Sequence, residues 1–332
     1  MRAIVFTQKN VVSIQELPDP HPSNDEVVVQ VHASGICHTD IEVLRGNYGS
    51  SAFPVVPGHE YAGTIVEVGA GVTGIKIGDR VVVDPNFECG KCRSCQKGWT
   101  HLCKDLKAYG VTHHGGFAEK SLVKSSAVHP IGDMPFEIAA LAEPMACVLN
   151  GLDAAKAKIA QNALIFGAGP IGLLLAIGMR VQGVQDIYVV DLNQDRLDFT
   201  KSMSFNPVLA NSSELEALRQ GVDLVVDATG VPAVAESLTH YIADGGVGSF
   251  FGVCPSDVTI KIKPFELFRR QLSLVGSHSL NHNIPQALDI IRSFGQGIGK
   301  LTTHKMSLEQ VAEVLEGNAP KDSMKIQWGS NL

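Results

Sequence analysis

Four cysteines lie within a short stretch of this sequence, and their spacing is typical of a metal site. Cys89, Cys92, Cys95 and Cys103 form a C-x2-C-x2-C-x7-C pattern. Four thiolates suit Zn²⁺, and a site without an open coordination position is structural rather than catalytic. Ferredoxins share the first three spacings, but there the fourth cysteine follows three residues later and precedes proline. The longer last spacing here favours zinc over an iron–sulfur cluster.

A second group of potential metal ligands is dispersed along the chain. Cys37 stands in GICHTD, His59 and Glu60 stand in PGHEYAG, and Glu143 stands in LAEPM. Singly, such residues are more often structural. Together, a thiolate, an imidazole and a carboxylate provide the three ligands that a catalytic zinc needs beside its open position. Asp40 is a suitable acceptor for the imidazole N–H that faces away from the metal.

The segment GAGPIG follows the strand-like NALIF and opens the helix-like IGLLLAIGMRV, which is the context of a dinucleotide-binding turn. We expect Gly167 to form the tight turn, Gly169 to let the backbone approach a pyrophosphate, and Gly172 to permit close helix packing. The helix N-terminus would face the phosphates. Asp191 ends the next strand-like run and is placed to bind the ribose hydroxyls.

Asp191 also favours NAD over NADP. Its carboxylate would repel a 2′-phosphate, and the two residues that follow it, Leu192 and Asn193, supply no cation. The positive charge of Arg196 would offset this repulsion of a 2′-phosphate only in part.

Three changes of pattern divide the chain into the elements that must position these residues. Up to about residue 142, Val-rich runs separated by Gly and Pro predict a β-rich region. From about residue 162, apolar runs alternate with Gly turns and helical stretches, as in a parallel sheet covered by helices on both faces. The candidate strands are NALIFG, DIYVVD, NPVLAN, VDLVVDATG, VGSFFGV and LSLVGSH. From about residue 280, the amphipathic helices IPQALDIIRSF and LEQVAEVLE lead to the strand-like KIQW.

Composition narrows the class of protein. The 332 residues are 45% apolar and 18% charged, which excludes a disordered or fibrous chain. A net charge of −7 without a basic block argues against nucleic-acid binding. No secretory signal is apparent, and the uncharged stretch 163–179 contains four glycines and a proline, so we expect strand, turn and helix rather than a membrane span. We therefore expect a cytoplasmic protein that acts on a small molecule.

Together these segments resemble the zinc-containing medium-chain dehydrogenase/reductase family of alcohol, polyol and threonine dehydrogenases. The resemblance covers essentially the whole chain, through GICHTD, PGHEYAG, GDRVVV, the cysteine pattern, GAGPIG and DATG in their family order. It implies a mixed α/β fold: a GroES-like catalytic domain over 1–145 and 280–332, with a structural zinc lobe at about 84–106, and an inserted Rossmann-type NAD-binding domain over 146–279. It also implies an active site in the cleft between the two domains.

The same resemblance implies a catalytic zinc. Cys37, His59 and Glu143 match its ligands, and Glu60 matches a nearby acid that can enter or leave the coordination shell. Simple-alcohol dehydrogenases carry Cys where Glu143 stands, whereas the AEP context is similar to sorbitol, xylitol and related polyol dehydrogenases. We therefore expect oxidation of a secondary alcohol of a polyol to a ketose, by alkoxide formation on zinc and hydride transfer to NAD. Thr39 matches the hydroxyl that takes the alcohol proton.

Two features of the sequence bear on which residues bind the catalytic zinc. Cys147 lies four residues after Glu143 and could share a helix face with it, and we favour the carboxylate as ligand. Zn²⁺ with Cys37 and Glu143 is neutral, and adding Glu60 makes the site −1. We therefore expect Glu60 to bind only transiently, to help product release or water exchange.

The remaining expectations follow from the same family pattern. Further cofactor contacts are expected at Pro170, Ile171, Thr229, Gly252 and Val253. In the substrate pocket, Phe117 is either a pocket wall or a core aromatic, and Ser279 stands where polyol dehydrogenases often present Arg. Many relatives have a His where this chain has Glu42, so the residue that passes the substrate proton on to solvent is unassigned. The short chain is similar to that of homotetrameric members.

Three alternative interpretations stay open. L-threonine 3-dehydrogenase is the alternative within the enzyme class, and its substrate ammonium would need an acidic partner near the metal. A zinc-ribbon binding or regulatory protein would explain the cysteine lobe but not the dinucleotide-binding pattern. A metal-free quinone-reductase-like relative would have no reason to keep Cys37, His59 and four clustered thiols.

Overall fold

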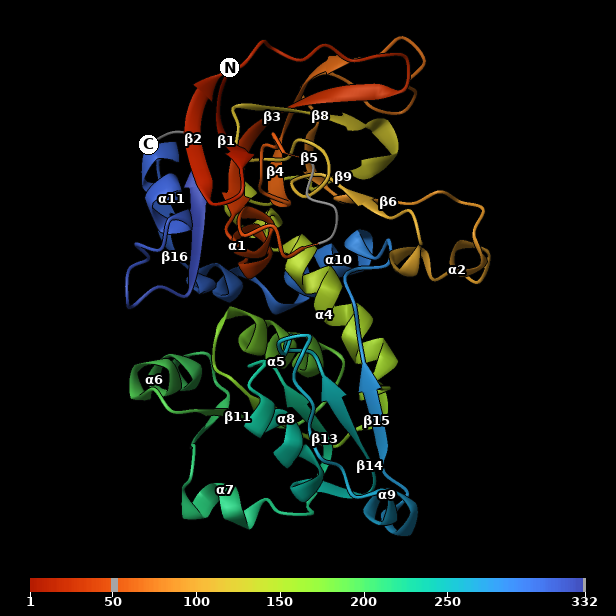
Figure 1. The fold of residues 1–332 in the computed structure, drawn as a ribbon, viewed down its shortest axis with the longest axis vertical. Coiled ribbons are helices and arrows are strands. Elements are labelled where there is room, and N and C mark those ends of the chain that lie inside the picture. Colours follow the sequence, from red (N-terminus) through yellow and green to blue (C-terminus); the bar gives the residue numbers. More distant parts are fainter. Residues whose placement is uncertain (49–52, 331–332) are drawn as a thin grey trace. The chain divides into compact units, whose positions relative to one another are not determined.

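The computed structural model describes residues 1–48 and 53–330, and the chain divides into two compact units. Unit 1 comprises Met1–Pro144 and Asn281–Leu332, and unit 2 comprises Met145–Leu280. The chain passes into unit 2 along α4 (Ala142–Ala154) and returns after β15 (Ser273–Gly276), as Figure 1 shows.

Unit 1 is built on a seven-stranded sheet with the order β16-β17-β3-β4-β5-β9, in which β8 also pairs with β3. Only the β16–β17 pairing is parallel. The Val-rich runs form its central strands and bury Val27, Val29 and Val31 in the core. The strands are β3 (Glu26–Gly35), β4 (Glu60–Val68), β5 (Arg80–Val83), β8 (Lys120–Lys124), β9 (Val128–Pro130), β16 (Thr302–Met306) and β17 (Lys325–Gly329).

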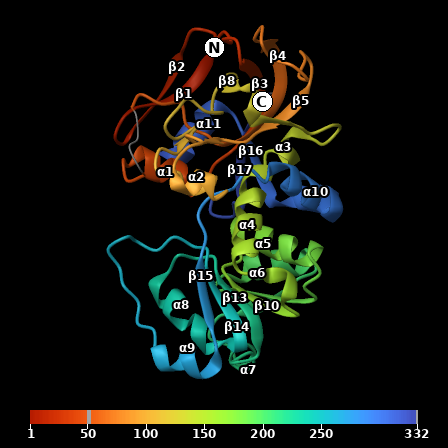
Figure 2. The same ribbon diagram turned by 90° about the vertical axis from the view of Figure 1, so that its right-hand side faces the viewer.

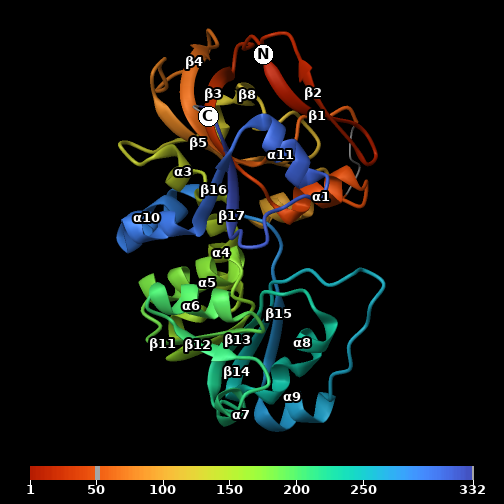
Figure 3. The same ribbon diagram turned by 90° about the vertical axis from the view of Figure 1, so that its left-hand side faces the viewer.

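Two small antiparallel strand pairs and several short helices complete unit 1. A hairpin joins β1 (Arg2–Gln8) to β2 (Val11–Glu16), and β6 (Asn86–Phe87) pairs with β7 (Lys107–Ala108) across the cysteine lobe. The helices are α1 (His38–Leu44), α2 (Arg93–Gln96), α3 (Phe136–Ala139), α10 (Ile284–Phe294) and α11 (Leu308–Leu315). Figure 3 shows the returning C-terminal segment, in which β16 and β17 lie side by side near α11.

The two amphipathic helices predicted after residue 280 are α10 and α11, and both predictions are confirmed. In α10 the buried residues are Ile284, Ala287, Leu288 and Ile291, which is the spacing of one helix face. In α11, Ser307 accepts a hydrogen bond from the amide of Gln310 and begins the helix with a capping box.

Unit 2 is a six-stranded parallel sheet with the order β12-β11-β10-β13-β14-β15. All six predicted runs form strands, and the central ones, such as β10 and β13, are buried on both faces. Besides β15 these are β10 (Asn162–Phe166), β11 (Asp186–Asp191), β12 (Asn206–Leu209), β13 (Val222–Asp227) and β14 (Ile242–Phe250). The helices are α5 (Pro170–Val181), α6 (Gln194–Ser202), α7 (Ser213–Ala217), α8 (Pro232–Ser237) and α9 (Pro264–Arg270).

This sheet has the doubly wound topology that the sequence predicts. Figure 2 shows α5 on one side of it and α8 on the other. The strand order reverses between β10 and β13, and the carboxyl ends of parallel strands at such a reversal bind dinucleotides in this fold. The mixed α/β prediction is therefore confirmed.

The uncharged stretch 163–179 forms most of β10, a glycine turn and most of α5. In the described parts of the chain, none of the helices combines the length and the apolar character needed to cross a membrane.

Candidate metal centre and dinucleotide site

A buried aspartate joins the two segments that carry the first metal donors. Cys37 precedes α1, and its amide donates to Asp40 Oδ2 at 2.8 Å. The other oxygen, Asp40 Oδ1, accepts the Gly58 amide at 3.2 Å. Asp40 is fully buried, so it fixes the start of α1 against the segment that carries His59.

The same aspartate orients His59. His59 Nδ1 lies 3.3 Å from Asp40 Oδ1, within ion-pair distance. Because Nδ1 faces the carboxylate, Nε2 is the nitrogen left for a metal. Burial lowers the pKa of His59, but the charges of Asp40 and Cys37 outweigh burial and hold that pKa well above its ordinary value. Metal binding at Nε2 requires the neutral imidazole, so a bound metal would act against this shift.

The donor set fits one zinc ion. Cys37, His59 and Glu60 each offer one ligand atom, and these atoms lie within 4.8 Å of one another. Bonds of about 2.0–2.3 Å place the donors of a tetrahedral zinc ~3.3–3.8 Å apart. Glu60 is almost completely buried, and its Oε2 atom lies in ion-pair contact with the ammonium of Lys325.

Glu143 lies outside this set of converging atoms. It is buried in the first turn of α4, and its charge contributes to raising the pKa of Lys325. Cys147, one helical turn further along α4, is half-buried. Glu143 and Cys147, the two alternative ligands, therefore lie on the same face of α4.

Lys325 was missed by the sequence analysis. It opens β17, is buried, and its ammonium donates to Glu60 Oε1 at 2.7 Å and to the Ile36 carbonyl at 2.9 Å. Burial lowers the pKa of Lys325, but the charges of Glu60 and Cys37 outweigh burial and raise it. The strand-like KIQW predicts a strand there, but no local spacing signals that its first residue faces Glu60.

The cysteine lobe brings together the four predicted structural ligands. The sulfur of Cys92 lies 3.4 Å from that of Cys95 and 3.9 Å from that of Cys103, which lies 3.5 Å from Cys89. Backbone N–H groups of Cys95 and Lys104 lower the pKa of Cys92 to about 6. Sulfurs at these separations, with amides that favour thiolate, fit the four-thiolate zinc site.

Two neighbouring residues attach the returning chain to this lobe. Asn281 accepts the Thr100 hydroxyl at 2.7 Å and donates to the Gly98 carbonyl at 3.0 Å. His282 places Nδ1 3.0 Å from Asp84 and Nε2 2.9 Å from Glu88. The hydrogen bond to Asp84 and the other carboxylate contacts raise the pKa of His282 to about 9, against burial.

Replacing His282 by asparagine is expected to reduce stability at pH 6 but not at pH 10. The folded pKa of about 9 exceeds the unfolded value, so the contribution is complete below ~6.5 and is lost as pH rises through about 9. Burial lowers the pKa of the neighbouring His129, and the charged groups that contact His282 in the described parts of the chain are Asp84 and Glu88. Asparagine tolerates the left-handed φ of +53° at this position.

Denaturant unfolding of both proteins at pH 6 and pH 10 measures this effect. At pH 6 we expect the free energy of unfolding of the variant to be lower than that of the wild type by on the order of 1 kcal/mol. This value allows for the solvent screening of a half-exposed imidazole. An equal difference at both pH values would contradict a charged His282.

The glycines of GAGPIG form the turn between β10 and α5. Gly167 has φ +105°, and its amide donates to the Val190 carbonyl at 2.8 Å. A Cβ on Gly172 would lie 1.8 Å from the Gly167 carbonyl oxygen, whereas a Cβ on Gly169 would meet nothing within 4 Å. Pro170 and Ile171 are the first two residues of α5. Gly172 is therefore required by packing, and Gly169 borders open space.

Asp191 supports this turn from the end of β11. Its Oδ2 accepts the Ala168 amide at 2.8 Å and its Oδ1 accepts the Asn193 amide at 2.9 Å. Each carboxylate oxygen has a second lone pair for a ribose hydroxyl. Arg196 Nη1 lies 3.9 Å from Asp191 Oδ2.

The DATG segment brings three further candidates together at the carboxyl ends of β13 and β14. Asp227 Oδ1 accepts the amide and the hydroxyl of Thr229 at 2.7 and 2.6 Å. A Cβ on Gly252 would lie 2.2 Å from the Gly230 amide nitrogen, so the two loops are in contact. Val253 follows and is 89% exposed.

The remaining candidates are placed as follows. Thr39 is half-buried in the first turn of α1. Phe117 is fully buried in the hydrophobic core of unit 1. In unit 2, Ser279 has φ +55°, and its carbonyl accepts a hydrogen bond from Asn150 Nδ2 at 2.9 Å.

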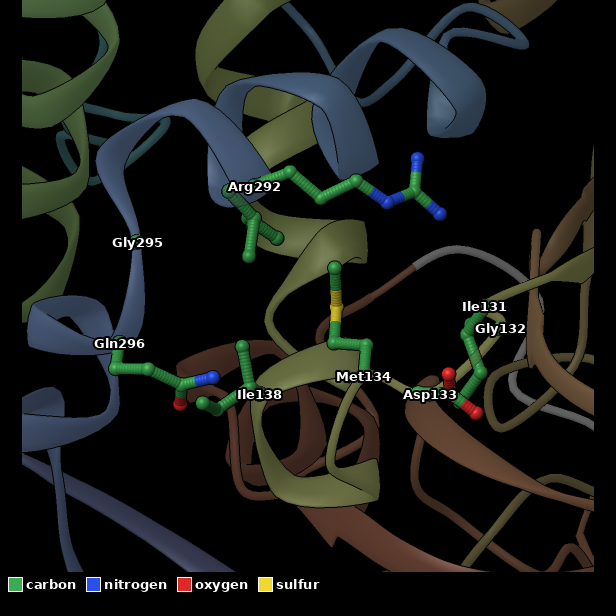
Figure 4. Close-up of a pocket in the computed structure, with 9 residues that line it drawn as sticks. Ile131, Gly132, Asp133, Met134, Ile138, Arg292, Gly295 and Gln296 are labelled. Carbon is green, nitrogen blue, oxygen red and sulfur yellow. The ribbon is translucent and has the colours of Figure 1, made fainter.

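A pocket of about 440 Å³ in unit 1 is separate from these candidates. It is lined by residues 131–134 and by Ile138, Ile291, Arg292, Gly295 and Gln296. Figure 4 shows Met134 and Ile138 in the space that Arg292 and Gln296 border. No predicted metal, cofactor or substrate residue lines it.

Comparison with known proteins identifies the family. Residues 23–133 match the alcohol dehydrogenase GroES-like domain, and residues 170–293 match the zinc-binding dehydrogenase domain. The chain is 48% identical to D-altritol 5-dehydrogenase of Agrobacterium fabrum, over 99% of this chain and 100% of the relative. It is 32% identical to D-arabinitol dehydrogenase 1 of Uromyces fabae, over 98% of this chain and 96% of the relative.

A solved structure extends this result to the fold. A Sinorhizobium meliloti protein described as a zinc-binding dehydrogenase, bound to NADP, is similar with a TM-score of 0.93 and 29% identity, over 99% of this chain and 98% of that one. The predicted family, fold class and cofactor class are confirmed. The chain belongs to the zinc-containing medium-chain dehydrogenase/reductase family, the zinc- and NAD(P)-dependent alcohol dehydrogenases of polyol type.

Proposed function

We propose that this protein oxidises a secondary hydroxyl of a sugar alcohol to a ketose, with NAD as hydride acceptor. The observation that carries the proposal is the convergence of Cys37, His59 and Glu60 on one point in a chain of this family. The names of the altritol and arabinitol dehydrogenases support a sugar alcohol as the substrate class.

The residues of the metal centre would have different roles. Cys37, His59 and Glu143 would hold the zinc, and Glu60, whose oxygen converges with the Cys37 and His59 donors, would bind it transiently. When bound, the zinc supplies the Lewis acidity that lowers the pKa of an alcohol. Asp40 keeps Nε2 of His59 toward the metal. The Thr39 hydroxyl, two residues beyond Cys37, would receive the substrate proton. The four clustered cysteines would hold a second, structural zinc.

The cofactor assignment rests on unit 2. Gly167, Gly169, Pro170, Ile171 and Gly172 would cradle the pyrophosphate, while Thr229, Gly252 and Val253 border the neighbouring strand ends. The Asp191 carboxylate favours the ribose hydroxyls of NAD over a 2′-phosphate. Arg196 lies beside it, so some NADP binding is compatible with this arrangement.

We also propose a cytoplasmic homotetramer. Four clustered thiols ready for a metal favour a reducing compartment. Among the described residues, edge strand β15 pairs on one side, with β14, and Phe265 and Phe268 of α9 are largely exposed, which supports association between copies. Light scattering of the native protein would give the number of chains.

A substrate screen on zinc-replete protein tests the function. D-altritol, arabinitol, sorbitol, xylitol and L-threonine would be offered with NAD and with NADP, and reduced cofactor would be followed by absorbance. We expect kcat/KM to be highest for a sugar alcohol with NAD. A preference for L-threonine would support the threonine dehydrogenase alternative, and inactivity with two bound zinc ions would refute the proposed substrate class.

A further inference from the structure

Three neighbouring strands place a buried ion pair beside the metal donors. Glu60 of β4 pairs with Gly35 of β3, and Gly35 pairs with Gln327 of β17. Lys325 precedes Gln327 by two residues and therefore lies on the same face of β17. Lys325 and Glu60 form an ion pair in which both side chains are nearly inaccessible to water.

A glycine leaves the space in which this pair forms. A Cβ on Gly35 would lie 2.3 Å from Glu60 Oε2 and 3.0 Å from Lys325 Cε. The φ of Gly35 is not positive, so backbone conformation does not require glycine here. The requirement is steric, because any side chain at position 35 would push the carboxylate and the ammonium apart.

Glu60 therefore faces two cationic partners. One is Lys325, whose buried ammonium needs a negative charge beside it. The other is the metal, because a Glu60 oxygen belongs to the set of donor atoms that converges with those of Cys37 and His59. A carboxylate held in a salt bridge is a weaker metal ligand than a free one.

We propose that Lys325 is a positioning residue of the metal centre, which competes with zinc for the Glu60 carboxylate and keeps a coordination position free for substrate. This inference rests on the metal site of the proposed function. The charges agree with it, because Zn²⁺, Cys37, Glu143 and Glu60 sum to −1 and the Lys325 ammonium offsets that charge. The neighbouring buried Asp40 is satisfied separately, by the Cys37 and Gly58 amides and by His59. Without Lys325, the metal is the cation that remains to balance the buried Glu60 carboxylate.

Replacing Lys325 by methionine tests this, because methionine keeps an unbranched stem and removes the charge. We expect the catalytic zinc to leave for a chelating dye about tenfold more slowly, the scale on which groups around metal ligands act. Release of the structural zinc is the internal reference, and Cys37→Ser shows which kinetic phase is catalytic. We also expect a lower kcat/KM, since Glu60 then competes with substrate.

The matched control is Lys305→Met. Lys305 lies on the adjacent strand β16 and also pairs with a glutamate, Glu137, at 2.7 Å. Its replacement should leave both zinc release rates unchanged. In a Glu60→Gln, Lys325→Met double variant, release should be no slower than in Glu60→Gln alone.

Gly35→Ala provides the same test without a change of charge, and it decides the question if Lys325→Met does not fold. It should also slow catalytic zinc release. Catalytic zinc release from a folded variant that is as fast as, or faster than, in the wild type would overturn the inference while leaving the proposed function standing. A wild-type protein that binds only the structural zinc would refute both.

Discussion

Glu143→Ala is expected to lower the zinc content from two ions per chain to one and to reduce kcat/KM by at least ~10³-fold, about 4 kcal/mol of barrier. Glu143 and Glu60 are buried acids, and the charges of both raise the pKa of the buried Lys325. A metal ion held by Cys37, His59 and Glu143 would balance the charge of its anionic ligands. Removing one anionic ligand should therefore weaken metal binding and remove the Lewis acid from the reaction.

Cys147→Ser is the matched control, because Cys147 lies one turn further along the same helix. This variant should keep two zinc ions and wild-type activity. Metal analysis and cofactor absorbance on the two purified variants make the measurement, and the remaining structural zinc reports that Glu143→Ala is folded. If instead Cys147→Ser loses zinc and Glu143→Ala keeps it, the thiolate is the ligand and the centre is of the simple-alcohol type.

The fold could be predicted from local sequence because each element carries its own signal. The strands of unit 2 are continuous apolar runs, and α10 repeats its apolar residues with helical spacing. The cysteine lobe is equally local, since its four sulfurs come from one short segment. In each case the interaction that matters lies within a few residues of the pattern.

The centre around Cys37 could not be predicted in the same way. Its donors come from separate segments that Asp40 draws together, so their spacing carries no signal and the family pattern had to suggest them. Lys325 is the clearest example of a site residue that local sequence cannot predict. It reaches Glu60 only because β17 pairs with β3 in one register and because Gly35 has no side chain. Neither condition can be derived from KIQW alone.

Gly172→Ala is expected to destabilise unit 2 by about 3 kcal/mol or more, since its Cβ would lie 1.8 Å from the Gly167 carbonyl oxygen. The obstacle is backbone, which cannot rotate away as a side chain can. The turn and α5 would have to separate, and NAD binding should be lost with them. Thermal unfolding without cofactor should show a lower Tm.

Gly169→Ala separates the cofactor role of the turn from its packing. Gly169 has φ −76° and borders open space, so alanine should leave the Tm of the cofactor-free protein unchanged. Its methyl group would occupy the space through which a pyrophosphate approaches the backbone, so NAD affinity should fall about 10- to 100-fold, or ~1.4–2.8 kcal/mol. Calorimetric titration with NAD measures the change. Because the variant keeps the fold, unchanged affinity would mean that the dinucleotide binds elsewhere than on this turn.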